Sequence, residues 1–196
     1  MPQYFDESPR VASSKADVVM EVGGARLVLR TDRGVFSHGR IDAGTGLLLR
    51  VAPPPPPQGT LLDLGCGTGA LALALAYLAP EATVWAVDVN ARARELTASN
   101  AATNSLANVV VADTGDIPAG VQFDLIWSNP PIRIGKPALH DLLSTWLHRL
   151  AADGRAVLVV QKHLGADSLQ RWLIAEGWPT TRRASSRGYR VLEVTR

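Results

Sequence analysis

Several things that this 196-residue chain lacks limit what it can be. It has a single cysteine, Cys66, which excludes an internal disulfide framework and fits a reducing cytoplasm. No apolar run reaches the roughly 18 residues that a membrane span needs. The first 17 residues are polar and include Asp6 and Glu7, unlike a signal peptide. No spacing of Cys and His suggests a metal site. These absences predict a cytoplasmic protein with neither a membrane segment nor a bound metal.

The composition is that of a globular protein with an ordinary core. Hydrophobic residues make up 46% of the chain, and the length fits one domain with at most a small appendage. The net charge is only +2, so the pI near 9 is mild support for an acidic partner. Two interpretations of the arginine-rich end stay open: a solvated strand edge with charged gatekeepers or a surface that faces RNA. Its arginines are Arg182, Arg183, Arg187, Arg190 and Arg196.

Residues 1–52 are predicted to form an N-terminal extension. Residues 18–22 and 26–31 are β-rich runs around Gly23-Gly24, which is typical of a hairpin, and residues 34–36 could continue its sheet. A short helix is expected over residues 42–51. The proline run that follows cannot join a helix or a central strand, so residues 53–58 are interpreted as a stiff connector.

Residues 59–196 alternate between apolar runs and amphipathic segments. This pattern predicts an α/β fold: a Rossmann-like, seven-stranded, mostly parallel sheet that ends in an antiparallel hairpin. The N-terminal β-hairpin would be a small appendage to it. The expected strands are residues 60–64, 83–87, 109–112, 123–127, 156–160, 180–184 and 190–194. The expected helices are residues 69–78, 91–103, 138–150 and 167–176.

A glycine-rich loop follows the first strand of this core. Asp63-Leu64-Gly65-Cys66-Gly67-Thr68-Gly69 contains G-x-G-x-G, and glycine lets the backbone turn sharply and pass close to a ligand. The next helix would offer free N–H groups to a carboxylate or phosphate. Because Ala70 stands where the dinucleotide fingerprint accepts glycine or alanine, the loop alone does not identify the cofactor. A tight turn without a ligand is the alternative.

Two acidic residues end the neighbouring strands. Asp88 lies about twenty residues beyond the loop, where a carboxylate can accept hydrogen bonds from ribose hydroxyls. It could instead cap the helix that begins near Asn90. Asp113, with Thr114 beside it, could reach an adenine amino group, or it could simply form a turn before Gly115.

The segment Asn129-Pro130-Pro131 is the most discriminating feature of the chain. Two prolines directly after a buried strand end the ladder and restrict the backbone. Such a turn can point the Asn129 side-chain oxygen and the Pro130 carbonyl oxygen at one position. Two acceptors there would bind an NH2 group on a planar base or amide and aim its lone pair at an electrophile. A plain strand-ending turn is the alternative.

These motifs resemble class I S-adenosylmethionine-dependent methyltransferases. Asp63–Gly69 looks like their cofactor motif and Asn129–Ile132 like their amino-methylating motif. Gly34-Val35-Phe36-Ser37, followed by Asp42, Gly44, Thr45 and Leu47–Leu49, is similar to a segment of the "small" methyltransferase domain, which includes 16S ribosomal RNA guanine-N2 methyltransferases. Relatives often carry Phe-His where this chain has Ile132-Arg133. The longer enzymes also have an N-terminal pseudo-catalytic domain.

The resemblance implies S-adenosyl-L-methionine as the cofactor and assigns roles to individual residues. Substrate binding would involve Phe36, as a lid or else a core residue, and Arg133, which could stack on a base. Thr45 would contact the methionine end of the cofactor, or would only be a hydroxyl at a helix N-terminus. The implied catalytic residues are Asn129, Pro130, Pro131 and Ile132. The implied cofactor-binding residues are Thr45, Asp63, Gly65, Cys66, Gly67, Gly69, Asp88, Val89, Asp113, Thr114 and Asn129.

The leading hypothesis is an N-methyltransferase for an exocyclic amine of an RNA base, with guanine N2 in ribosomal RNA favoured. The partner would be rRNA or the small ribosomal subunit. Within the same chemistry, a protein glutamine amide is the alternative substrate. An NAD-binding oxidoreductase and a non-catalytic RNA-binding relative are alternatives from other classes.

Overall fold

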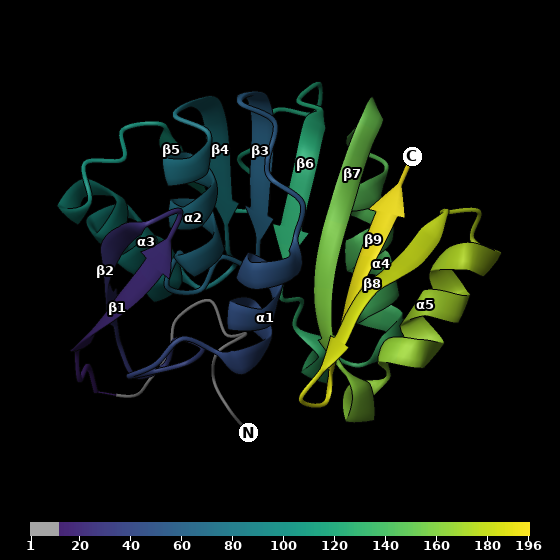
Figure 1. Ribbon diagram of the computed structural model, residues 1–196, viewed down its shortest axis with the longest axis horizontal. Coiled ribbons are helices and arrows are strands. Elements are labelled where there is room, and N and C mark those ends of the chain that lie inside the picture. Colours follow the sequence, from purple (N-terminus) through teal and green to yellow (C-terminus); the bar gives the residue numbers. More distant parts are fainter. Residues whose placement is uncertain (1–11) are drawn as a thin grey trace.

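The computed structural model describes residues 12–196, so the first eleven residues of the expected extension lie outside the described part. Its main sheet has seven strands in the order β5-β4-β3-β6-β7-β9-β8, parallel except where β9 pairs with β7 and β8 (Figure 1). This confirms the expected mostly parallel sheet with a terminal antiparallel hairpin. Its strands are β3 (Gln58–Leu64), β4 (Glu81–Val87), β5 (Val109–Ala112), β6 (Phe123–Ser128), β7 (Leu150–Gln161), β8 (Thr180–Ser186) and β9 (Tyr189–Thr195).

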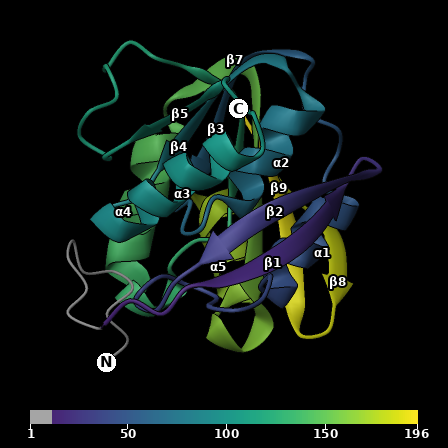
Figure 2. The ribbon, with the colours of Figure 1, turned by 90° about the vertical axis from the view of Figure 1, so that its left-hand side faces the viewer.

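The N-terminal hairpin forms a separate two-stranded sheet. Strands β1 (Ala16–Val22) and β2 (Ala25–Thr31) pair antiparallel, outside the main sheet (Figure 2). Asn100 of helix α3 (Ala91–Thr103) and Asn104, the C-cap of that helix, bind the free edge of β2. Asn100 accepts from Arg30 N at 2.8 Å, and Asn104 accepts from Val28 N at 2.9 Å. The two side-chain amides also donate to the carbonyls of Arg30 and Val28. These bonds satisfy backbone groups that an exposed edge strand would leave unpaired.

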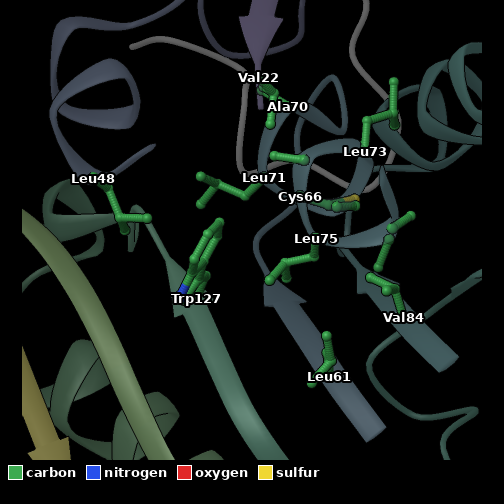
Figure 3. Close-up of a cluster of buried hydrophobic side chains, with 14 of the residues drawn as sticks. Val22, Leu48, Leu61, Cys66, Ala70, Leu71, Leu73, Leu75, Val84 and Trp127 are labelled. Atoms are coloured by element: carbon green, nitrogen blue, oxygen red, sulfur yellow. The ribbon is translucent and has the colours of Figure 1, made fainter. Parts of the chain in front are cut away.

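Helices cover both faces of the main sheet. The core on one face joins the hairpin, α1 (Ala43–Val51) and α2 (Ala70–Leu78) to the sheet, with Leu48, Leu71 and Trp127 meeting there (Figure 3). The core on the other face contains α4 (Lys136–Leu147) and α5 (Ala166–Ala175). Two short 3-10 helices, η2 (Ile132–Ile134) and η3 (Lys162–Leu164), follow β6 and β7. Within residues 12–196 no helix combines the length and apolar character needed to cross a bilayer.

Three of the sequence-based boundaries are wrong. Residues 34–36 form turns rather than a strand, with Gly34 at a φ of 82°. The third helix of the core was expected over 138–150, but α4 ends at Leu147 because Leu150 already begins β7. Strand β7 therefore begins six residues before the expected strand. Leucine spacing alone could not separate the helix from the strand that follows it, since both bury leucines.

Parallel register brings the ends of four strands to one edge of the sheet. Leu64 of β3 pairs with Val87 of β4 and with Ser128 of β6, and Val87 pairs with Ala112 of β5. The buried Ser128 hydroxyl donates to the Leu64 carbonyl at 2.7 Å, which ties β6 to β3 at this edge. The residues that follow these strands are thereby placed side by side, as expected for ligand binding in open α/β sheets.

Candidate active site

The glycine-rich loop turns away from β3 in a conformation that favours glycine. Gly65, Gly67 and Gly69 have φ values of 76°, 55° and 85°. The N–H groups of Gly65 and Cys66 both donate to the Val87 carbonyl at 2.9 Å, so the loop is joined to the end of β4. A Cβ on Gly65 would meet nothing within 4 Å, whereas one on Gly69 would lie 2.9 Å from Thr97. The loop therefore packs closely at its end and leaves open space beside Gly65.

The Asp88 carboxylate closes this loop from the neighbouring strand. One oxygen accepts from Gly67 N and the other from Asn90 N, each at 2.9 Å. Burial raises the pKa of Asp88, and these two N–H groups offset only part of that effect. The helix α3 has its own N-cap, since Asn90 Oδ1 accepts from Ala93 N at 3.1 Å. Each Asp88 oxygen keeps lone-pair capacity toward a ligand.

Asp63 carries the most unusual polar atom of the site. Its side chain is 1% exposed, and Oδ2 accepts from Ala72 N at 2.8 Å. Its other oxygen, Oδ1, has no hydrogen-bond partner among the described residues. Burial raises the pKa of Asp63 to about 7, against the opposing effect of the Ala72 N–H. A buried oxygen without a partner is costly, so the position suits a ligand that brings a hydrogen-bond donor.

Gly65, Gly67 and Asp88 line a cavity of about 580 Å³ at the carboxyl edge of the sheet. A recess of about 40 Å³, lined among others by Thr45, Asp63 and Cys66, shares Gly65 and Asn129 with it. Of the residues assigned from the resemblance, the large cavity is lined by Phe36, Gly65, Gly67, Asp88, Val89, Thr114, Asn129, Pro130, Pro131, Ile132 and Arg133. The volume of the cavity and its lining by both apolar and polar residues are typical of a small-molecule binding site.

Asn129 is held in one orientation. Its amide nitrogen Nδ2 donates to Asp42 Oδ2 at 2.9 Å and to Thr45 Oγ1 at 3.1 Å. Because an amide has two ends, this leaves the oxygen Oδ1 for another donor. Asn129 lines both the cavity and the recess. That this oxygen accepts from a substrate NH2 group stays a prediction.

The two prolines form a tight turn after Asn129. Pro131 has φ −75° and ψ 71°, and the Ile132 N–H donates to the Pro130 carbonyl at 2.8 Å, which is an inverse γ-turn. One lone pair of that carbonyl is therefore used within the chain, and the second stays available. That the Pro130 carbonyl and the Asn129 side-chain oxygen both accept hydrogen bonds from one NH2 group stays a prediction.

The third acidic residue takes part in a local ion pair. The Asp113 carboxylate lies 2.7 Å from Arg94 Nη1 and accepts from the Thr114 hydroxyl at 3.0 Å. Burial tends to raise the pKa of Asp113, but the Thr114 and Gly115 hydrogen bonds and the Arg94 charge together lower it. Thr114 lines the large cavity and Asp113 does not. Contact between Asp113 and an adenine ring stays a prediction.

Cys66 contributes its backbone to the loop while its side chain is buried. The thiol accepts from the Thr97 hydroxyl at 3.4 Å and is 6% exposed. Burial raises the pKa of Cys66 well above its usual value. A thiol that stays protonated is a poor nucleophile, so this side chain serves packing.

The arginine-rich C-terminal hairpin forms ion pairs. Arg182 and Arg183 lie 2.7 and 2.6 Å from Asp167 and Glu193 respectively, and Arg190 lies 3.5 Å from Asp167. Since β8 is an edge strand, these charges favour the gatekeeper interpretation over an RNA-facing surface.

Sequence reasoning assigned no role to two residues that complete the site. Asp42 caps α1, accepting from Gly44 N at 2.8 Å and Thr45 N at 3.0 Å. Tyr189, the first residue of β9, lines the large cavity, and its pKa is raised by burial and by the nearby charge of Asp42. An Asp two residues before a Gly-Thr pair is a recognisable N-cap signal, but nothing local indicates that it contacts Asn129.

A doubly covered, mostly parallel sheet with this terminal hairpin and loop defines the class of Rossmann-like methyltransferase folds. Residues 26–193 match the family model of the methyltransferase small domain. The chain is 34% identical over 168 residues to the Bacillus subtilis protein named "Uncharacterized protein YbxB", covering 84% of each chain. It is 34% identical over 167 residues to ribosomal RNA small subunit methyltransferase C of Pseudomonas entomophila, covering 83% of this chain and 49% of that protein.

The solved structures agree with this fold. A Thermus thermophilus 16S rRNA N2 G1207 methyltransferase, in complex with AdoMet and guanosine, superposes with a TM-score of 0.78 at 24% identity, over 96% of this chain and 52% of that one. A ribosomal protein L11 methylase from Lactobacillus delbrueckii superposes with a TM-score of 0.64 at 23% identity, over 78% of this chain and 76% of that one. The chain belongs to the methyltransferase small domain family and is an S-adenosylmethionine-dependent methyltransferase. It spans about half the length of the rRNA methyltransferases it matches.

Proposed function

We propose that this protein methylates an exocyclic amine of an RNA base, with guanine N2 of ribosomal RNA as the acceptor. The carrying observation is the orientation of Asn129, whose NH2 end is bound to Asp42 and Thr45. Its oxygen is left for another donor, and Asn129 lines a cavity of about 580 Å³. An acceptor at this place suits a substrate NH2 group.

The cofactor fits the residues around the cavity. The unpartnered Asp63 Oδ1 suits an ammonium group, and Thr45 lies beside it on the same recess. Asp88 has lone pairs for ribose hydroxyls, and Gly65 leaves room for a close approach. Bound S-adenosylmethionine supplies an electrophilic methyl group on a sulfonium.

The protein's part in the reaction is alignment. Asn129 Oδ1 and the Pro130 carbonyl would accept from the substrate NH2 and turn its lone pair toward the methyl carbon. The nitrogen–carbon bond forms as the carbon–sulfur bond breaks, with its electron pair passing to sulfur. Orientation of this kind can supply roughly 7–11 kcal/mol of the barrier. The same acceptors stabilise positive charge that develops on nitrogen, which then loses a proton to water.

Two observations support RNA as the substrate. Curated relatives that are 34% identical are named as small-subunit rRNA methyltransferases. The rim of the cavity also carries cations, because Arg40 and Arg133 line it and are exposed, while Lys136 and Lys162 are exposed just beyond η2 and β7. Phe36 lines the cavity and is 43% exposed, so its ring would offer a face on which a base could stack. A paired base would have to be extruded, at a cost of a few kcal/mol.

The substitution Asn129→Ala tests this function. We expect methyl transfer to fall by about 100-fold or more, because the acceptor that orients the amine is lost. Affinity for S-adenosylmethionine, measured by calorimetry, should stay within about threefold, since the loop, Asp63 and Asp88 are intact.

Three substrates separate the alternatives: deproteinised rRNA, assembled small ribosomal subunits, and a release-factor-like protein. Labelled methyl donor followed by nucleoside analysis should reveal N2-methylguanosine in one of the RNA arms. Label on a protein glutamine instead would move the assignment to the amide substrate. Cofactor binding without transfer to either RNA would contradict the proposal.

A further inference from the structure

One carboxylate connects the start of α1, the Asn-Pro-Pro turn and the last strand. Asp42 Oδ2 accepts from Gly44 N, Thr45 N and Asn129 Nδ2 at 2.8, 3.0 and 2.9 Å. The Tyr189 side chain lies close to the same carboxylate, and burial and the negative charge of that carboxylate together raise the pKa of Tyr189. Asp42 and Asn129 are 87 residues apart in sequence. So many donors on one carboxylate exceed what capping a nine-residue helix requires.

The geometry allows only one orientation of the Asn129 amide. A carboxylate oxygen carries no hydrogen, so the end of the amide that faces Asp42 must be the NH2 end. In this orientation the Thr45 hydroxyl also accepts from Nδ2, at 3.1 Å, although a hydroxyl can bond either end of an amide, so Asp42 sets the choice. A flipped amide would set its oxygen against the Asp42 carboxylate, which is repulsive. The oxygen is thereby the end left for a ligand in the cavity that Asn129 lines.

The surrounding packing keeps the carboxylate in place. The Tyr189 ring lies so close to the start of α1 that a Cβ on Gly44 would be 2.7 Å from it. That same Cβ would be 2.9 Å from Asp42 Oδ2. Only glycine at position 44 therefore lets the Tyr189 ring pack against the start of α1 beside this carboxylate. Tyr189 also lines the cavity, so the network extends to the substrate side.

We propose that Asp42 is a positioning residue for methyl transfer: it holds the Asn129 amide with its oxygen toward the substrate amine. Tyr189 supports it by packing its ring against the start of α1. This inference rests on the proposed function, in which Asn129 Oδ1 accepts from the amine. Neither Asp42 nor Tyr189 contacts the reacting atoms in this scheme.

Two substitutions of Asp42 separate positioning from helix capping. Asp42→Ser keeps a good N-cap but is too short to reach Asn129 as well. Asp42→Asn keeps both the cap and an acceptor for Nδ2. We expect Asp42→Ser to lower kcat by about 10- to 100-fold, with KM for S-adenosylmethionine and Tm nearly unchanged. Asp42→Asn should retain activity within a few-fold.

Parallel losses of kcat, cofactor affinity and Tm in Asp42→Ser would show that Asp42 is only a structural cap and would overturn the inference. Unchanged kcat in Asp42→Ser would do the same. Inactivity of folded Asp42→Asn would also contradict it, because an acceptor at residue 42 would then not be sufficient.

A readout without substrate keeps this test separate from the proposed function. The Asn129 side-chain NH2 signals in an ¹⁵N-correlated NMR spectrum, assigned by their loss in Asn129→Ala, should be protected from exchange in the wild type. They should lose protection in Asp42→Ser and keep it in Asp42→Asn. Failure of RNA methylation with this pattern intact would refute the substrate and leave the positioning contact standing. Unprotected signals in the wild type would refute the contact itself.

Discussion

At the residue scale, the site depends on two polar side chains, each of which has only one of its two polar atoms hydrogen bonded within the described part of the protein. Asn129 uses its nitrogen for hydrogen bonds within the protein, and in the proposed function its oxygen accepts from the substrate. Asp63 uses one oxygen within the protein and leaves the other without a partner. Both side chains are incomplete without a ligand, and both lie on the same recess. Such half-satisfied groups are a physical mark of a binding site.

Asp63 predicts a pH dependence of stability. Its pKa of about 7 lies above its ordinary value of 3.8, so between about pH 4 and 7 the folded state holds a proton that the unfolded state has lost. The contribution of Asp63 to the unfolding free energy is fully present below about pH 4 and is lost as the pH rises through 7. It amounts to a few kcal/mol at most. Urea denaturation from pH 4 to 8 should show this slope, and Asp63→Asn should flatten it.

The same group predicts proton release on cofactor binding. An ammonium beside Asp63 favours the carboxylate, so binding of S-adenosylmethionine below pH 7 should release a proton. Calorimetry in buffers of different ionisation enthalpy measures this directly, and Asp63→Asn should bind without it. Equal proton release by both proteins would place the titrating group elsewhere.

At the element scale, the turn before α2 requires glycine for two reasons: a positive φ and close packing against neighbouring side chains. Gly69 has a φ of 85° and packs against Thr97 and Leu73. Its conformation starts the helix with no side-chain cap, and its own N–H donates to the Cys66 carbonyl at 2.7 Å. Any larger residue would push α2 and α3 apart where they meet the loop.

Gly177 offers a matched control for this contact. Its φ is 86°, and a Cβ there would meet nothing within 4 Å. Gly177→Ala should therefore cost only the backbone strain, about 1–2 kcal/mol. Gly69→Ala should cost at least about 1 kcal/mol more, because the new methyl group would lie 2.9 Å from Thr97 Cγ2. Chemical denaturation of both variants measures the difference, and equal losses would mean that the neighbours yield freely.

At the scale of the whole molecule, charge is distributed unequally between two parts of the surface. Arg133 is exposed and lines the cavity. Arg183, on the edge strand β8, lies 2.6 Å from Glu193. Each contact between an arginine and a phosphate releases counterions and so strengthens RNA binding. If the cavity rim contacts RNA phosphates, Arg133 should contribute to binding and Arg183 should not.

Salt dependence of RNA binding tests this distribution. Arg133→Ala should weaken binding of an rRNA fragment and reduce the slope of log K against log salt by about 1. Arg183→Ala should leave both quantities nearly unchanged. Fluorescence anisotropy across a salt series measures both variants. A larger effect at Arg183 would move the RNA surface to the C-terminal hairpin.

Most of the fold could be predicted from the sequence, because its signals are local. Helix α3 spans the residues expected from periodicity, and α1 differs only in that Asp42 is its cap. The boundary between α4 and β7 was missed, since leucines are buried on both sides of it. The turn at Gly34 was missed because glycine permits a strand as well as a turn.

By itself, the sequence determined the order of strands and helices and the two motifs at the carboxyl edge. Glycine, proline and alternating apolar residues act over short distances, and their effect can be predicted residue by residue. Only the tertiary structure decided which polar atoms meet. The contact between Asp42 and Asn129 spans 87 residues, and the burial that raises the pKa of Asp63 comes from packing of the whole sheet. Such contacts depend on how separate elements come together, and no local pattern encodes them.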